Sequence, residues 1–290
     1  MSTSAALLLL ADSRFPTGAH AHSAGIEASH ARGDIRTVHD LAAFLDGRLL
    51  TTAPVEAAFA AAACAAATVM AARDAATARA TSSAASAAST IGADAVSAQS
   101  IRRQSGLTAS DESDGSGESA ALAALAANDA SAGSDSLAEL DHELQIRTPS
   151  PRLRSVSRSL GRQLLRPAER AWPSDRYASL RALHVEGPMQ PIALGVVAAA
   201  AGLTPRDAAL CSLHHLVGAA TTAAVRLLGL DPFDVHALAA RLGPSLDEIA
   251  AEAARIVATR PPHELPATTS LLADILAEHH ATWEVRLFAS

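Results

Sequence analysis

The chain has 290 residues, of which 49% are hydrophobic and only 3% aromatic, and its formal net charge at pH 7 is −7. It contains no lysine, so all 23 basic residues are arginine, which excludes a Walker A phosphate loop, a protein-kinase lysine and a lysine Schiff base. The acidic balance argues against nucleic acid as the main partner, because phosphate binding needs a basic face. Alanine dominates the apolar residues and favours helices, so we expect an all-α fold.

The N-terminal region predicts two short helices separated by a proline and glycine break, within residues 7–27. On the second helix His22 and Ile26 are four residues apart, as are Ser23 and Glu27, so these side chains share one broad face. A histidine beside a carboxylate is a candidate proton-transfer or metal pair. The alternative is that Ser23 and Glu27 form hydrogen bonds across a helix packing contact.

Neither apolar run in the first third of the chain predicts a targeting or membrane segment. The leucine run near the N-terminus is short and follows no basic residue, unlike a signal peptide. Residues 57–72 are mostly alanine and fall short of the roughly 20 residues of a membrane span. We therefore expect a cytoplasmic protein that does not associate with a membrane.

A composition shift near residue 71 marks the clearest boundary in the chain. Residues 71–136 are rich in Ala, Ser, Thr, Gly and Asp, and their few large apolar side chains cannot offset the entropy of ordering. We expect a disordered low-complexity insertion there, with a short helix around residues 120–127. All eight aromatic residues lie outside it, so residues 1–70 and 137–290 together should form one domain.

Helical patterns fill both flanks of this insertion. A stripe at Val38, Leu41, Leu45 and Leu49 follows Thr37 as N-cap. Further along, Thr204-Pro205 opens a helix, and residues 245–248 read as a capping box that opens another after the break at 243–244. The flanks predict a single helical bundle of about eight to ten helices. The arginine-rich stretch 147–170 is either a solvated helix face or a protein-contact face.

The C-terminal tail is unusually apolar for a free end. It carries Trp283, Arg286, Leu287 and Phe288 and ends at Ser290. Apolar anchors with an arginine are typical of a docking segment. The alternative is that the tail folds back onto its own core.

The twelve histidines and two cysteines do not predict a tight metal site. His20 and His22, His214 and His215, and His279 and His280 are close pairs, but no His-Glu-x-x-His or Cys-His grouping is present. Weak coordination of nickel by imidazole stays open, with His20 and His22 as weak candidates. The two isolated cysteines form neither a disulfide framework nor a zinc knuckle. No nucleophile elbow, dinucleotide loop or paired-carboxylate motif is found, so no other part of the sequence looks catalytic.

The two end motifs together resemble the urease accessory protein UreF family. The family pattern near the N-terminus is matched by Leu10-Ala-Asp12-Ser13-Arg-Phe-Pro16-Thr-Gly18 and by His22-Ser23-Ala-Gly25-Ile26-Glu27. The ending Arg286-Leu287-Phe288-Ala-Ser290 is similar to the family's Arg-Leu-Phe-x-Ser. The resemblance covers the two flanks and leaves out the insertion.

This resemblance implies an all-α, dimeric, non-enzymatic protein. Members of the family bridge the accessory protein UreD, also called UreH, and the nickel GTPase UreG, and the assembly loads nickel into apo-urease. No cofactor would be bound tightly, and the complex would handle the nickel. The tail would dock on the UreD-like partner through Trp283, Arg286, Leu287, Phe288 and Ser290. A surface or passage would be shaped by Asp12, Pro16, Gly18, His22, Ser23 and Glu27.

Two rival functions stay open at this point. One is a metallochaperone whose histidines carry the nickel ion themselves. The other is a helical enzyme of unknown class, which would lack any recognisable catalytic constellation.

Overall fold

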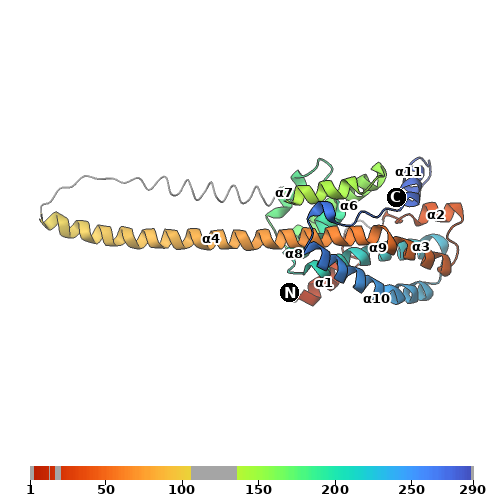
Figure 1. Ribbon diagram of the computed structural model, residues 1–290, viewed down its shortest axis with the longest axis horizontal. Helices are drawn as coiled ribbons and strands as arrows, with labels where there is room; N and C mark the ends of the chain where they lie inside the picture. Colours follow the sequence, from red (N-terminus) through yellow and green to blue (C-terminus); the bar gives the residue numbers. More distant parts are fainter. Residues whose placement is uncertain (1–2, 13, 17–20, 106–135, 289–290) are drawn as a thin grey trace. The chain divides into compact units, whose positions relative to one another are not determined.

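The computed structural model describes residues 3–12, 14–16, 21–105 and 136–288, with side chains given outside 83–105 (Figure 1). These residues form α-helices and one 3-10 helix, and no β-strand occurs among them, which confirms the all-α prediction. The elements in chain order are α1 (Thr3–Ala11), α2 (Ile26–Arg32), α3 (Val38–Leu50), α4 (Thr52–Ser105), a helix over residues 136–146, α6 (Pro151–Ala171), α7 (Arg176–Ala182), α8 (Gln190–Ala200), α9 (Pro205–Leu228), α10 (Pro232–Val257), the 3-10 helix η2 (Pro262–Glu264) and α11 (Leu271–Ala281).

The chain divides into two compact units, one of Met1–Thr68 with Asp135–Ser290 and one of Val69–Ser134. Helix α4 runs from the first unit into the second and includes residues 71–105. The high helix propensity of alanine favours this helix even where residues 71–82 bury few side chains. The low-complexity insertion expected at 71–136 stays a prediction. Residues 106–135, with the short helix expected at 120–127, lie outside the described residues.

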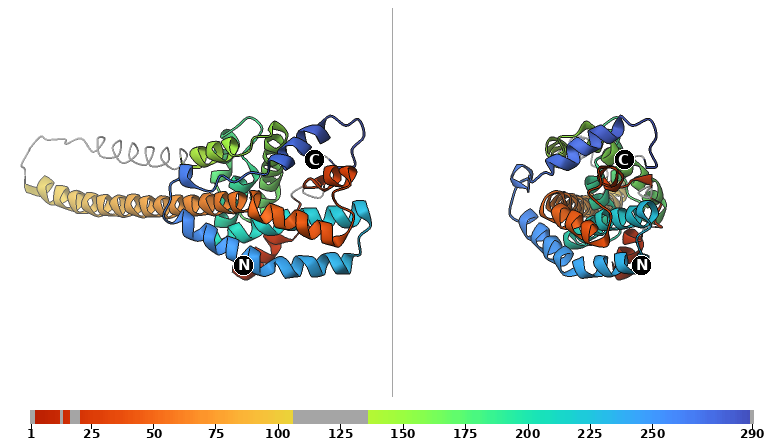
Figure 2. Two further views of the ribbon diagram at one scale, coloured as in Figure 1. Left: turned by 45° about the vertical axis from the view of Figure 1, so that its right-hand side comes forward. Right: turned by 90° about the vertical axis from the view of Figure 1, so that its right-hand side faces the viewer.

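The core of the larger unit is built from the predicted apolar stripes. Figure 2 shows the backbone of the helices that carry them. Helices α3, α9 and α10 pack against one another and against the first turns of α4. The α3 stripe is buried at Leu41, Leu45 and Leu49, as its spacing predicts. Capping boxes at Thr37 and Thr204 begin α3 and α9 at the predicted residues.

Helix α10 corrects one predicted boundary. The expected capping box at residues 245–248 is wrong, because α10 continues through Gly243 and Pro244 to Val257. The buried positions Leu238, Leu242 and Leu246 continue one stripe across the proline. Packing of this stripe on the core outweighs the backbone hydrogen bond that a proline removes.

Small residues let the remaining helices approach closely. Helix α8 meets α4 at Gly195, where an added Cβ would lie 2.3 Å from the carbonyl oxygen of Ala60. The same Cβ would lie 2.8 Å from the backbone nitrogen of Cys64. A core poor in aromatic residues is thus filled by close backbone contact between alanine- and glycine-rich helices.

Among the residues that the structure describes, two helices are long and apolar enough to cross a membrane by length and composition, Thr52–Ser82 of α4 and all of α9. Within their most apolar windows, 50% and 56% of the residues are buried in the fold. Both helices belong to the protein's own core, which accounts for their hydropathy.

Candidate functional site

The carboxylate of Glu27 joins the N-terminal motif to the C-terminal tail. Glu27 lies in the first turn of α2, and the residue is 8% exposed. Its Oε2 accepts hydrogen bonds from His280 Nε2 at 2.9 Å and from the Phe288 backbone N–H at 3.0 Å. Its Oε1 accepts one from the Leu287 backbone N–H at 2.8 Å. We call this arrangement of Glu27, His280 and the two tail amides the Glu27 site.

The tail residues around this site point in opposite directions. Phe288 is 7% exposed and packs in the core, with the guanidinium carbon of Arg226 5.0 Å from its ring centroid. Leu287 is 75% exposed and Val285 is 81% exposed. Trp283 packs on the imidazole of His280, with ring centroids 4.7 Å apart. The tail is therefore attached to its own domain while it presents two apolar side chains outward.

Helix α11, which leads into the tail, is attached to the start of α6 by two carboxylates, the buried Asp274 and the exposed Glu278. Asp274 accepts hydrogen bonds from the Ser150 backbone N–H at 3.3 Å and the Thr269 hydroxyl at 2.9 Å. Glu278 accepts from the Ser150 hydroxyl and, at 2.8 Å, from the Arg152 backbone N–H. These donors lower the pKa of Glu278, the Ser150 hydroxyl most. Both carboxylates thus bind the N-terminus of α6, where the helix dipole favours negative charge.

The N-terminal part of α11 exposes large apolar side chains, whereas Glu278 and His279 are exposed further along the helix. The buried residues of α11 are Asp274, Leu276 and His280. The exposed apolar side chains are those of Leu271, Leu272 and Ile275. Exposed large apolar side chains close together on one helix are typical of an interaction surface.

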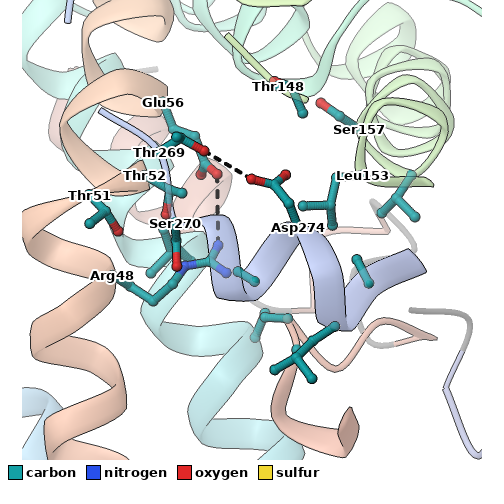
Figure 3. A pocket seen from close by; sticks show the side chains of 18 of the residues that line it. Arg48, Thr51, Thr52, Glu56, Thr148, Leu153, Ser157, Thr269, Ser270 and Asp274 are labelled. Carbon is teal, nitrogen blue, oxygen red and sulfur yellow. Dashed lines mark hydrogen bonds and ion pairs between the residues drawn. The ribbon is translucent and has the colours of Figure 1, made fainter. Parts of the chain in front are cut away.

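A cavity of about 700 Å³ lies beside the Glu27 site, with Ser23 and His280 in its wall. Figure 3 shows another part of the lining, in which Arg48 Nη2 lies 4.0 Å from Glu56 Oε1. Desolvation raises the pKa of Glu56, and the charge of Arg48 opposes this effect. The buried hydroxyls of Thr52 and Ser212 line the cavity and have no hydrogen-bond partner. The cavity could hold water or a small polar molecule at these groups.

The other predicted site residues are distributed unevenly. Ser23 is fully buried, and His22 is half-buried in the cavity wall. Asp12 pairs with Arg14 at 2.7 Å, which lowers the pKa of Asp12 to about 2. Pro16 is exposed. Gly18, His20 and Ser290 lie outside the described residues.

The expectation for Phe288 needs revision. It was expected as an apolar anchor for a partner, but it occupies a pocket of its own core because the Glu27 site turns its backbone inward. Of the two interpretations of the tail, folding back onto the core applies to Phe288; Val285 and Leu287 stay outside, and docking on a partner stays a prediction. Arg286 is exposed beside them.

Sequence reasoning missed His280, Asp274 and Glu278 as attachment residues. The one available indication was the spacing of Asp274 and Glu278, two acids four residues apart on an otherwise apolar helix. No sequence pattern linked His280 to Glu27, which is 253 residues away.

The arginine-rich stretch serves several structural roles. Arg158 is 2% exposed and bonds to Asp141, Gln145 and the Gly187 carbonyl oxygen. Arg147 donates to carbonyl oxygens of the segment after α10, including His263 at 2.9 Å and Pro266 at 3.2 Å. Arg162, Arg166 and Arg170 remain exposed along α6.

Within the described ranges, no three His, Cys, Asp or Glu side chains are grouped so that they could hold a metal ion. His214 is exposed, whereas the neighbouring His215 donates from Nε2 to the Leu10 carbonyl oxygen at 2.9 Å. Burial lowers the pKa of His215 to about 4. Burial also raises the pKa of the Cys64 and Cys211 thiols to about 12, so neither is a reactive thiolate at neutral pH.

Comparison with known proteins shows the family of the chain. The family model described as UreF matches residues 109–243. Urease accessory protein UreF from Mycobacterium sp. (strain JLS) is 33% identical over 292 aligned residues, that from Mycobacterium marinum 33% over 290, and that from Mycobacterium tuberculosis (strain ATCC 25618 / H37Rv) 31% over 292. Each alignment covers 100% of both chains. The chain therefore belongs to the UreF family of urease accessory proteins and, like them, is not an enzyme.

Proposed function

We propose that this protein bridges a UreD/UreH-type accessory protein and the nickel GTPase UreG while nickel is inserted into apo-urease. The observation that supports this role is a set of exposed large apolar side chains in the last 20 residues of the chain. They belong to Leu271, Leu272, Ile275, Val285 and Leu287, and we call this set the docking surface. We assign the docking surface to the UreD-type partner.

The physical basis of the proposed docking is burial of apolar area. A fully buried Leu or Val side chain contributes about 1.5–3 kcal/mol relative to an exposed one. Burial of Val285 and Leu287 alone would therefore contribute about 3–6 kcal/mol before the costs of association are subtracted. A contribution of this size to the binding free energy is large enough that the complex would not form without the tail.

We also propose that the protein is a cytoplasmic homodimer and that the assembled complex, not this chain alone, carries the nickel. The Glu27 carboxylate already accepts hydrogen bonds from three donors, so it has little capacity to bind a metal ion. This observation supports the proposal that the chain alone does not carry the nickel. Preference for one nucleotide state of UreG would let the scaffold regulate the GTPase. A tenfold preference requires about 1.4 kcal/mol, which a few contacts can supply.

Substitution of the outward-facing tail residues tests the docking role. The double variant Val285→Ser/Leu287→Ser should weaken binding to the UreD-type partner at least tenfold in calorimetry, with the melting temperature unchanged. The matched control is Val185→Ser, since Val185 is 97% exposed and lies in the loop between α7 and α8. Wild-type affinity in the double variant would refute the assignment of this surface.

A further inference from the structure

We propose that Glu27 is a positioning residue, which holds the C-terminal tail in the one register that exposes Val285 and Leu287 to a partner. This inference rests on the proposed docking function for its consequence. The hold on the tail can be measured without any partner.

The register follows from the hydrogen bonds. Glu27 accepts from two consecutive backbone N–H groups, those of Leu287 and Phe288, at 2.8 and 3.0 Å. Consecutive amides of an extended segment point in opposite directions, so both can face one carboxylate only if the chain turns there. The turn directs Phe288 into the core and leaves Leu287 outside.

Because the Glu27 carboxylate is buried, it favours the one tail conformation in which both backbone amides donate to it. A buried carboxylate is costly unless hydrogen bonds compensate its lost hydration. Here the His280 ring and the two tail amides supply the compensation, and hydrogen bonds to an ionised acceptor are stronger than neutral ones. Glu27 and the tail therefore stabilise each other, so a tail that moves out leaves the acid unsatisfied.

The second attachment of the tail is the side chain of Phe288, and it does not fix the conformation of the main chain. Phe288 contacts the core cluster and the Arg226 guanidinium, which anchors one side chain without setting the main-chain direction. Without the carboxylate, the tail would keep its apolar anchor and lose its register. Binding to a partner would then require ordering of the tail first, and the apparent Kd would rise by the inverse of the fraction held in register.

Two substitutions separate the hydrogen bonds from the packing. Glu27→Ala removes both acceptor oxygens. Glu27→Gln keeps the size of the side chain but replaces one oxygen with an NH2 donor. Whichever way the Gln amide is oriented, one of the two tail amides faces a donor and loses its acceptor. The control is Glu248→Gln, on the exposed surface of α10.

Amide-resolved hydrogen exchange on the full chain measures the tail directly. We expect the Leu287 and Phe288 amides to exchange at least tenfold faster in Glu27→Ala. In Glu27→Gln one of these two amides should change and the other should not, while Glu248→Gln should match the wild type. Unchanged exchange of both amides in Glu27→Ala would overturn the proposal.

The partner's affinity then tests the consequence of positioning. We expect Glu27→Gln to raise the Kd for the UreD-type protein about tenfold or more, with the melting temperature within the range of the control. Faster exchange together with wild-type affinity would overturn the positioning role. The Val285→Ser/Leu287→Ser variant serves as the reference, because its wild-type affinity would mean that the proposed docking function itself has failed.

Discussion

Removal of the Asp141 carboxylate should be among the most damaging single substitutions in this fold. Arg158 is 2% exposed, and its guanidinium is 2.9 Å from Asp141 Oδ2. Asp141 Oδ1 also accepts the Met189 backbone N–H at 2.8 Å. One carboxylate thus joins the helix over residues 136–146, α6 and the start of α8. In Asp141→Ala, Arg158 would be left as a buried charge without its counterion.

The expected cost follows from that unpaired charge. Breaking a buried ion pair by removing one partner costs about 3–5 kcal/mol, against a total stability of about 5–15 kcal/mol for a typical protein. Urea unfolding followed by the fluorescence of the buried Trp172 measures the loss. The double variant Asp141→Leu/Arg158→Met removes both charges, so it should be less destabilised than the sum of the single changes. A loss below about 1 kcal/mol in Asp141→Ala, or strict additivity in the double variant, would refute the reasoning.

Three further predictions follow from other features. The pKa of His215 is about 4 in the folded state against an ordinary value of 6.5, so the unfolded chain binds more protons between these pH values. The free energy of unfolding should therefore fall by up to about 1.4 kcal/mol per pH unit from pH 6.5 toward pH 4. The variant His215→Gln should make this pH dependence of unfolding less steep. Equilibrium dialysis of the isolated protein should find no sub-micromolar nickel binding, and tight binding lost on changing the histidine pairs would favour a metallochaperone instead. Deletion of residues 82–132 should leave the melting temperature unchanged, because we propose that residues 71–136 are an insertion outside the folded core, and a large drop would contradict this.

Local patterns predicted the parts of the fold that depend on neighbouring residues. The caps at Thr37 and Thr204 and the stripe of α3 depend on side chains within one or two turns, and the structure confirms them. The break expected at Pro244 failed because the continuous stripe on α10 is stabilised by other helices, which a local pattern does not reveal.

The candidate site was predicted only in pieces. The sequence identified both terminal motifs. However, Glu27 is 260 residues from Leu287 and 261 from Phe288, and a periodic sequence pattern cannot predict a contact between residues so far apart in the chain. The carboxylates of α11 were missed for a related reason. Asp274 and Glu278 accept hydrogen bonds from Ser150 and Arg152, which lie more than 120 residues away in the chain.

The burial of both native thiols offers a practical route to spectroscopic studies of the tail. With the pKa of Cys64 and Cys211 near 12, maleimide reagents should leave them unmodified in the folded protein. A single cysteine introduced by Leu287→Cys would then take a fluorophore or spin label selectively. Because Cys64 and Cys211 would stay unlabelled, the signal would report the motion of the tail alone.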